Sequence, residues 1–204
     1  MARISNDAPP VVATRDRRCR GWTLDNWVRR WWAPAGFEAD LLSIEPGQHV
    51  VDFGAGVGYL TPTMLERVGP SGIIDLVDPD PTHLSLARIH VGADTRVHLM
   101  VASAADAPSI SDRVVDRVVL SLVLCCMVDK SGALDEAWRV LRPGGLALVT
   151  YPERRWRLSA VKVSLRVSPE LWARLITRHP WTVLSSGRKR LIRRHLLQKP
   201  NDPV

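Results

Sequence analysis

The most informative segment of this chain reads Val50-Val51-Asp52-Phe53-Gly54-Ala55-Gly56-Val57-Gly58-Tyr59-Leu60-Thr61. Two β-branched residues and an acid lead into three glycines at alternate positions, and an apolar, periodic stretch continues to Val68. This pattern predicts a buried strand, a glycine turn and then a helix. Because glycine has no Cβ, such a turn can bring backbone N–H groups close to a bound ligand.

The spacing of the glycines narrows the class of ligand. Dinucleotide-binding turns carry the pattern G-x-G-x-x-G at the start of a helix. Here the third glycine, Gly58, comes one residue early, so the pattern is G-x-G-x-G. This difference argues against NAD and FAD as ligands.

Length and composition are those of a single globular domain. The chain has 204 residues, of which 46% are hydrophobic and 24% charged, and no apolar run is long enough to span a membrane. The Arg-rich first residues lack the apolar stretch of a secretory signal. Three cysteines, two of them adjacent at Cys125 and Cys126, do not make a disulfide framework. We therefore expect a protein of the reducing cytoplasm.

Charge is distributed unevenly along the chain. The net charge of +7 divides into +4 for residues 1–32, −8 for residues 33–153 and +11 for residues 154–204. Basic ends could attract an anionic substrate, nucleic acid or an anionic membrane surface. A solvated, Arg-rich surface explains the same charges equally well, so both interpretations stay open.

Changes in composition divide the chain into four parts. We expect a flexible basic arm (1–20), followed by one domain made of a helical cap (21–47), a core (48–153) and a C-terminal helix with a hairpin (154–204). The cap should hold a helix that carries Trp27 and Trp31, and then a short helix over 36–42. The indole rings could cover a ligand and exclude water, or simply pack as part of a helix.

In the core, apolar strand patterns alternate with helical ones. The expected strands cover 49–53, 73–77, 95–101, 114–120 and 146–151, and the expected helices cover 57–68, 81–90 and 132–140. This alternation predicts a doubly wound, mostly parallel sheet with helices on both faces, an α/β fold. After it, a helix starting at Pro169 and two strands at 181–184 and 191–197, joined by a 185–189 connection, predict a terminal antiparallel hairpin and seven strands in all.

Four segments, in order and at matching spacing, resemble the class I S-adenosylmethionine (SAM) dependent methyltransferases. They are Asp52–Gly58, Ile73–Pro79, Val101–Pro108 and Ala137–Gly145, and they extend over most of residues 48–153. The resemblance implies a Rossmann-like methyltransferase fold and an enzyme that binds SAM and releases S-adenosylhomocysteine (SAH). The segment at the end of the fourth expected strand and the motif Arg139-Val140-Leu141-Arg142-Pro143-Gly144-Gly145 resemble those of the branch that includes quinone and natural-product methyltransferases.

The same resemblance implies which residues hold the cofactor. The glycine turn would hold the methionine and ribose portions through its backbone, and Asp52 would orient that turn or reach the methionine amine through water. Asp78 would bind the ribose hydroxyls, with Pro79 against the adenine. The full implied set is Asp52, Phe53, Gly54, Ala55, Gly56, Gly58, Asp78, Pro79, Ser103, Ala104 and Ser121.

Two members of this set need separate mention. Ser103, which with Ala104 would frame the adenine edge, stands where the family usually has an acid, and a hydroxyl binds the adenine amine more weakly than a carboxylate does. Ser121 would offer its carbonyl oxygen to the methionine amine. Asp52 and Asp78 could instead only cap nearby backbone N–H groups, which would be a structural role.

The methyl acceptor is constrained mainly by what the sequence lacks. The segment Ser121–Leu124 differs from the N/D-P-P-Y type of motif found in enzymes that methylate exocyclic amines, and no Pro-Cys pair is present to attack a pyrimidine ring. Both differences disfavour DNA base methylation. Transfer from an electrophilic sulfonium depends mostly on in-line positioning, so no residue is assigned as a catalytic base. We predict a small-molecule acceptor and no metal.

Two alternative functions remain. The basic region Arg154–Arg194 would suit an RNA-directed methyltransferase or an anionic membrane surface, and Ser103 keeps open a non-catalytic binding module. We interpret Cys125 and Cys126 as small apolar groups rather than a thiol site. Tyr151, at the end of a core strand, is a candidate polar residue of the substrate pocket. His83 and His90 are expected at the surface.

Overall fold

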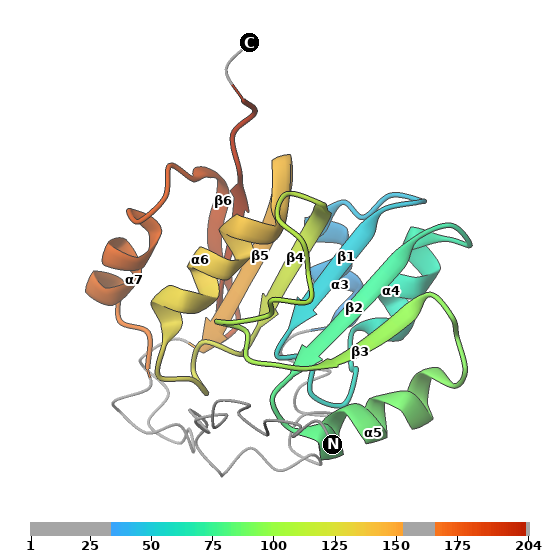
Figure 1. Cartoon of the computed structure of the whole chain (residues 1–204). Coiled ribbons are helices and arrows are strands. Elements are labelled where there is room, and N and C mark those ends of the chain that lie inside the picture. Colours follow the sequence, from blue (N-terminus) through green and yellow to red (C-terminus); the bar gives the residue numbers. More distant parts are fainter. Residues whose placement is uncertain (1–33, 153–165, 203–204) are drawn as a thin grey trace, which may run out of the picture.

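The computed structural model describes residues 34–152 and 166–202, which form one seven-stranded sheet (Figure 1). The strand order is β3-β2-β1-β4-β5-β7-β6. The strands are β1 (His49–Phe53), β2 (Ile73–Asp78), β3 (Val97–Val101), β4 (Val115–Ser121), β5 (Leu141–Pro152), β6 (Thr182–Lys189) and β7 (Ile192–Gln198). The first five pair in parallel, whereas β7 is antiparallel to both neighbours. The expected doubly wound sheet with a terminal hairpin is confirmed.

Helices cover both faces of this sheet (Figure 1). Within the described residues they are α3 (Ala35–Leu42), α4 (Thr61–Val68), α5 (Pro81–Val91), α6 (Lys130–Val140) and α7 (Pro169–Ile176). In Figure 1, α6 and α7 lie in front of the sheet, and α3 and α4 lie behind it. No helix in these ranges is long and apolar enough to cross a bilayer. The expected Trp27 helix and the Arg154–Arg157 segment lie outside the described residues.

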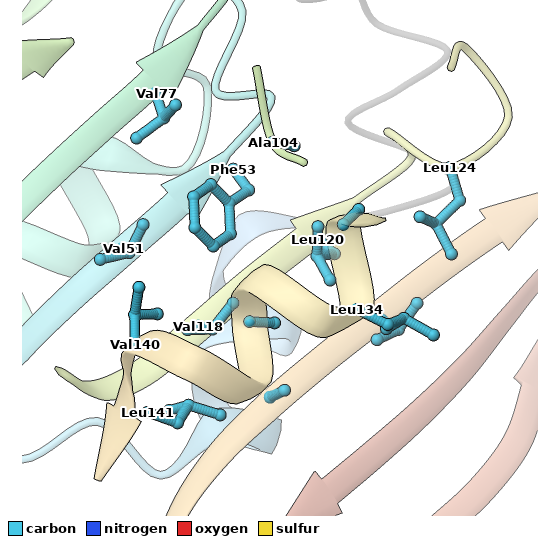
Figure 2. Close-up of a cluster of buried hydrophobic side chains, with 14 of the residues drawn as sticks. Val51, Phe53, Val77, Ala104, Val118, Leu120, Leu124, Leu134, Val140 and Leu141 are labelled. Carbon is cyan, nitrogen blue, oxygen red and sulfur yellow. The ribbon is translucent and has the colours of Figure 1, made fainter. Parts of the chain in front are cut away.

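Alternating strand residues fill two separate cores. On the α6 side, alternate residues of neighbouring strands meet the inner face of that helix (Figure 2). The labelled members are Val51, Phe53, Val77, Ala104, Val118, Leu120, Leu124, Leu134, Val140 and Leu141. The opposite face packs on α3, α4 and α5 through Leu42, Met64, Leu84 and their neighbours. Burial on both faces explains why the strands read as apolar runs.

Three expected boundaries differ most from the observed ones. Helix α4 begins at Thr61 rather than at residue 57, because the intervening residues are used by turns. The 185–189 segment belongs to β6, and the hairpin turn lies at Arg190 and Leu191 instead. Strand β5 begins at Leu141 rather than at residue 146, so residues 142–145 lie within it, and Gly144 there has a φ of +76°. In β6, the sequence Ser185-Ser186-Gly187 favours a turn locally, but pairing of this segment with β7 outweighs that preference.

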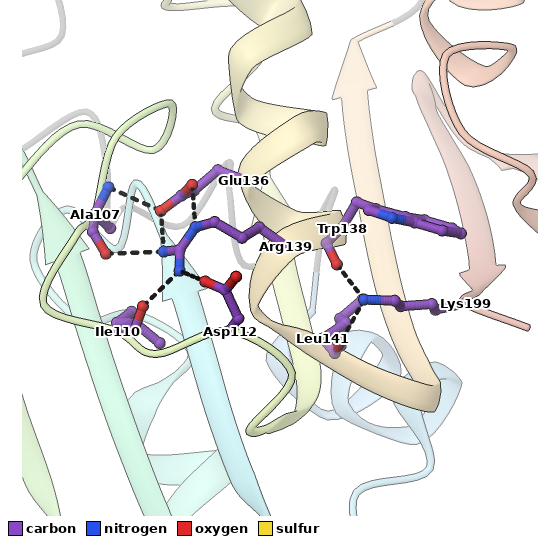
Figure 3. Close-up of polar contacts among 8 residues, drawn as sticks. All are labelled: Ala107, Ile110, Asp112, Glu136, Trp138, Arg139, Leu141 and Lys199. Carbon is purple, nitrogen blue, oxygen red and sulfur yellow. Dashed lines mark hydrogen bonds and ion pairs between the residues drawn. The ribbon is translucent and has the colours of Figure 1, made fainter. Parts of the chain in front are cut away.

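A buried lysine ends α6 at the base of the sheet (Figure 3). Lys199 donates to the carbonyl oxygens of Trp138 and Leu141, both at 2.7 Å. These carbonyls belong to the last helical turn, where no backbone N–H is available to bind them. Burial lowers the pKa of Lys199. The lysine therefore fixes the end of α6 against the start of the long strand β5.

On the same helix, Glu136 and Arg139 hold the loop between β3 and β4 (Figure 3). The Glu136 carboxylate accepts from the backbone N–H of Ala107 at 2.9 Å, and Arg139 donates to the carbonyls of Ala107 and Ile110 and to Asp112. Arg139 also pairs with Glu136. Hydrogen bonding by Arg139 and Ala107 lowers the pKa of Glu136 against the opposing effect of burial. The loop is thus fixed without a helix of its own.

Replacing Lys199 by methionine should destabilise the fold. The substitution keeps most of the aliphatic volume but leaves two carbonyl groups at the end of α6 without their donor, which typically costs about 1–3 kcal/mol. Urea unfolding followed by circular dichroism would measure the loss. The control Lys189→Met, on the exposed strand β6, should change stability by less than about 0.5 kcal/mol. Equal losses in the two variants would contradict this role for Lys199.

Candidate functional site

The expected site residues gather at the carboxyl edge of the sheet. Strands β1 and β4 are neighbours, and the chain leaves β1 toward β2 but leaves β4 toward β5. Ligands of open α/β sheets bind outside such a switch point, at the carboxyl ends of the strands. The ends of β1, β2, β3 and β4 carry Phe53, Asp78, Val101 and Ser121, so the residues predicted from sequence lie at or directly after these positions.

The glycine turn after β1 has a backbone conformation that requires glycine. Gly54, Gly56 and Gly58 have φ values of +72°, +58° and +75°, a region that L-residues with a Cβ rarely adopt. The turn is also crowded, because a Cβ on Gly54 would lie 2.3 Å from a methyl carbon of Val123. The alternate spacing of the glycines therefore follows from the local geometry.

Hydrogen bonds hold this turn on the end of β2. The N–H groups of Gly54 and Ala55 both donate to the carbonyl of Val77, at 2.7 and 3.1 Å. The Asp78 carboxylate accepts from the N–H of Gly56 at 2.9 Å. The turn is thereby fixed between β1 and the residue expected to bind ribose.

Asp78 itself makes more protein contacts than the sequence predicted. Its second oxygen accepts from the N–H of Asp80 at 2.9 Å and lies 3.2 Å from Nδ1 of His83. Counting Gly56, these contacts use three of the roughly four lone-pair positions of a carboxylate. His83 is 3% exposed, so the expectation of a surface histidine is wrong for it, whereas His90 is exposed as expected. Asp78 has a structural role whatever ligand it binds.

The remaining expected residues differ in which of their atoms, backbone or side chain, lie toward the carboxyl edge of the sheet. Phe53 and Ala104 point into the core on the α6 side, so only their backbone atoms face the edge (Figure 2). Asp52 is buried at the end of β1. Ser103 uses its hydroxyl to accept from the N–H of Ala105 at 3.1 Å, within its own turn.

At the end of β4, the structure shows a contact that sequence reasoning missed. The hydroxyl of Ser121 donates to Oε2 of Glu38, on α3, at 2.7 Å, and Glu38 is 1% exposed. Thr150, the neighbour of Ser121 on β5, lies 3.4 Å away. Glu38 belongs to no glycine, strand-end or turn pattern, and its partner is 83 residues distant in sequence. Only the tertiary fold reveals it.

Tyr151 has protein partners rather than an open pocket position. Its hydroxyl lies 2.9 Å from Nε2 of His195, whose Nδ1 lies 2.9 Å from the hydroxyl of Ser186. The ring of Trp172 stacks on His195 with centroids 4.1 Å apart. Burial, with a smaller effect from Arg193, lowers the pKa of His195 to about 4. This cluster joins β5, β6, β7 and α7.

The two adjacent cysteines lie in the loop after β4. Cys125 is buried and its thiol donates to the carbonyl of Leu122 at 3.1 Å, as a small core residue would. Across residues 34–152 and 166–202, no three His, Cys, Asp or Glu side chains come together as a metal site. The expectation of a metal-free protein stays a prediction.

Comparison with known proteins finds similarity to methyltransferases. Residues 51–149 match a family model described as a methyltransferase domain. The ubiquinone/menaquinone biosynthesis C-methyltransferase UbiE of Vibrio cholerae is 34% identical over 129 residues, which is 62% of this chain and 48% of the relative. The UbiE of Hydrogenovibrio crunogenus is 32% identical over 125 residues, 60% and 48% of the two chains. Over these residues the chain is similar to SAM-dependent and other methyltransferases.

Solved methyltransferase structures agree in fold. A SAM-dependent methyltransferase from Aquifex aeolicus superposes with a TM-score of 0.76 at 16% identity, over 87% of this chain and 95% of that one. The cyclase SpnF superposes with a TM-score of 0.68, also at 16% identity, over 82% and 80% of the chains. The chain spans about half the length of the curated relatives it matches.

The residues present at the carboxyl edge of the sheet fit SAM in their chemistry. SAM carries a ribose diol and two cationic groups, the sulfonium and the methionine ammonium. The carboxyl edge supplies the buried carboxylates of Asp52, Asp78 and Glu38, which suit hydroxyl donors and cations. The positive-φ glycines keep side chains away from the same edge.

Removing the Asp78 carboxylate should destabilise the protein even without ligand. In Asp78→Ala the buried N–H of Gly56 loses its acceptor and the start of α5 loses another, so we expect a loss of about 2–3 kcal/mol. Asp80→Ala removes the side-chain cap of α5, which accepts from Thr82 N–H, and a contact with Nε2 of His83 at 3.7 Å, and should cost about 1 kcal/mol. Denaturant unfolding of the two variants measures both values. A smaller loss for Asp78→Ala than for Asp80→Ala would argue against its structural role.

His195 should make stability depend on pH. Its pKa is about 4 in the fold and 6.5 in the unfolded chain, so between these values the unfolded state binds a proton that the folded state does not. Stability from this group is therefore complete above about pH 6.5 and decreases as pH falls toward 4, by up to about 3 kcal/mol. Urea unfolding at pH 7 and pH 5 measures the difference. His195→Gln should reduce it, whereas the exposed His90→Gln should not; an unchanged pH dependence in His195→Gln would contradict the assignment.

Proposed function

We propose that this protein is a SAM-dependent methyltransferase that acts on a small-molecule acceptor. The observation that carries the proposal is the glycine turn at the switch point, with three glycines at positive φ and Asp78 bound to its backbone. The family match over residues 51–149 supports it. The fold alone would not, because one fold hosts many activities and the structural neighbours include a cyclase.

Each part of the chain has a distinct task in this proposal. The bound SAM supplies an electrophilic methyl group on a sulfonium. The turn at Gly54–Gly58 positions the methionine and ribose portions through its backbone, and Asp78 accepts from the ribose hydroxyls. Ser121 offers its carbonyl to the methionine amine at the end of β4. Rigid placement of these groups lowers the barrier mainly by orienting the reactants.

The acceptor belongs to this proposal as well. The relatives at 32–34% identity are named as ubiquinone/menaquinone biosynthesis C-methyltransferases, which supports methylation of carbon in a small ring compound as the first activity to test. The RNA and membrane alternatives rest on the basic region Arg154–Arg194, of which residues 154–165 lie outside the described residues. Cytoplasmic localisation stays a prediction.

Cofactor binding should raise the melting temperature. At about 100 times its Kd, SAM or SAH adds roughly 2.7 kcal/mol, which for this chain length corresponds to about 5–10 °C. Asp78→Asn keeps the side-chain volume and one oxygen acceptor for Gly56, yet should lose most of this shift because the charge is gone. Thermal melting with each ligand measures both expectations.

Transfer of a labelled methyl group from SAM then tests the acceptor class. A demethylated quinone precursor should accept label, and bulk RNA should not. A protein that melts cooperatively but shows no shift with SAM or SAH would refute the enzyme and leave the binding-module alternative. Transfer of the labelled methyl group to RNA would refute the proposed small-molecule acceptor but not the methyltransferase activity.

A further inference from the structure

We propose that Cys125 and Cys126 form a dithiol site that binds a trivalent arsenical through both sulfur atoms. The two residues lie in the loop between β4 and α6, at the same carboxyl edge as the glycine turn. Cys125 packs as a small core residue, but Cys126 is only half-buried. Within the described residues, neither joins a disulfide. Binding at this site is independent of the proposed function, whereas its expected effect on the cofactor rests on that function.

The two thiols come together because the chain turns at the start of this loop. Adjacent residues of an extended strand point to opposite faces, which would separate such side chains. Here Leu122 has a φ of +58°, and the N–H of Cys126 donates to the carbonyl of Val123 at 2.8 Å. The Cys125 thiol donates to the Leu122 carbonyl at 3.1 Å, and the Cys126 sulfur lies 3.7 Å from the same oxygen. The two Sγ atoms are 3.9 Å apart, so one atom can bond to both after a small side-chain rotation.

A buried lysine supplies positive charge beside the thiols. Lys130 begins α6, is 5% exposed, and donates through Nζ to the carbonyl of Met127 at 2.6 Å. Burial lowers the pKa of Lys130, and Coulombic interaction with Cys125 and Cys126 opposes that effect. The ammonium group is therefore close enough to offset the negative charge that the sulfur atoms gain when they lose their protons. The thiolate is the form of cysteine that reacts with electrophiles.

The number of sulfur atoms decides the class of ligand. Structural zinc takes four ligands, and in residues 34–152 and 166–202 no third His, Cys, Asp or Glu completes a metal site. A trivalent arsenical with one organic group needs only two further bonds, and a soft centre of this kind prefers thiolates. Each S–H bond is replaced by an S–As bond, and each proton leaves as water with an arsenic-bound hydroxyl. No electrons are transferred.

The loop that carries the thiols also contacts the cofactor edge at both of its ends. Val123 packs on the glycine turn, because a Cβ on Gly54 would lie 2.3 Å from its methyl carbon. At the far end, a Cβ on Gly132 would lie 2.8 Å from the Cβ of Ala105, next to the segment expected at the adenine edge. An arsenic atom that draws the two sulfurs together changes the loop between these contacts. The arsenical and the cofactor should therefore weaken each other's binding, and by the same factor.

Phenylarsine oxide is the probe for this site. Reduced full-length protein is treated with it, and intact mass spectrometry measures how many phenylarsenic groups each chain holds. Wild type and the control Cys19→Ser, outside the described residues, should hold one group that survives excess monothiol but is removed by dithiothreitol. A chelate of two sulfur atoms resists a single competing thiol, so Cys125→Ser and Cys126→Ser should each lose this resistant group. Circular dichroism confirms that each variant is folded.

Three results would overturn the dithiol site. They are a wild type that holds no resistant group, a group that persists in Cys126→Ser, and a group that is lost in Cys19→Ser. If the buried Cys125→Ser variant does not fold, the half-buried Cys126→Ser variant decides the question. Lys130→Met should slow the labelling at least about threefold, whereas Lys189→Met, on the exposed strand β6, should not; equal rates in the two would contradict the role of Lys130.

Isothermal titration calorimetry with SAH tests the link to the cofactor. The arsenical-bound wild type should bind SAH at least about fivefold more weakly than untreated protein, and treatment of Cys126→Ser should leave its Kd for SAH unchanged. The same Kd in labelled and untreated wild type would overturn the coupling. A protein that holds the resistant group but binds no SAH before treatment would support the dithiol site and refute the proposed function.

Discussion

The hydrogen bond from Gly56 N–H to the Asp78 carboxylate is the constraint on which the site depends. Buried backbone N–H groups need an acceptor, and the positive φ of the glycines turns this N–H away from the chain's own carbonyls. One carboxylate therefore joins the turn after β1, the end of β2 and the start of α5. A change in the conformation of the Gly54–Gly58 turn would therefore also displace the carboxylate of Asp78, and the reverse holds as well.

A second constraint acts on the other side of the switch point. There α3 is held against β4 by Arg117 at its C-terminal end and by the contact of Glu38 with Ser121. The edge between β1 and β4 is consequently bordered by carboxylates from two different elements. Both carboxylates are buried, although the whole chain carries a net charge of +7.

The sequence predicted those features that depend on local pattern. Apolar alternation predicted β1 at its observed bounds, the order of the elements and the glycine turn. It placed the start of α4 four residues early, because a helical period cannot reveal that glycines before Thr61 adopt positive φ. Glu38, His83 and His195 were missed as buried polar residues, since each is fixed by packing and partners that sequence spacing does not encode.

The direction of β7 decides what surrounds the acceptor side of the site. Since β7 is antiparallel to β5, its first residue, Ile192, pairs with Pro152 at the carboxyl end of β5. A parallel strand would have placed this end of β7 at the opposite edge of the sheet. The hairpin turn, with Lys189 and Arg190, therefore lies at the same edge as the glycine turn. The part of the chain that follows the family match thus reaches the edge at which the glycine turn lies, and its side chains can differ among proteins of this fold without any change in that turn.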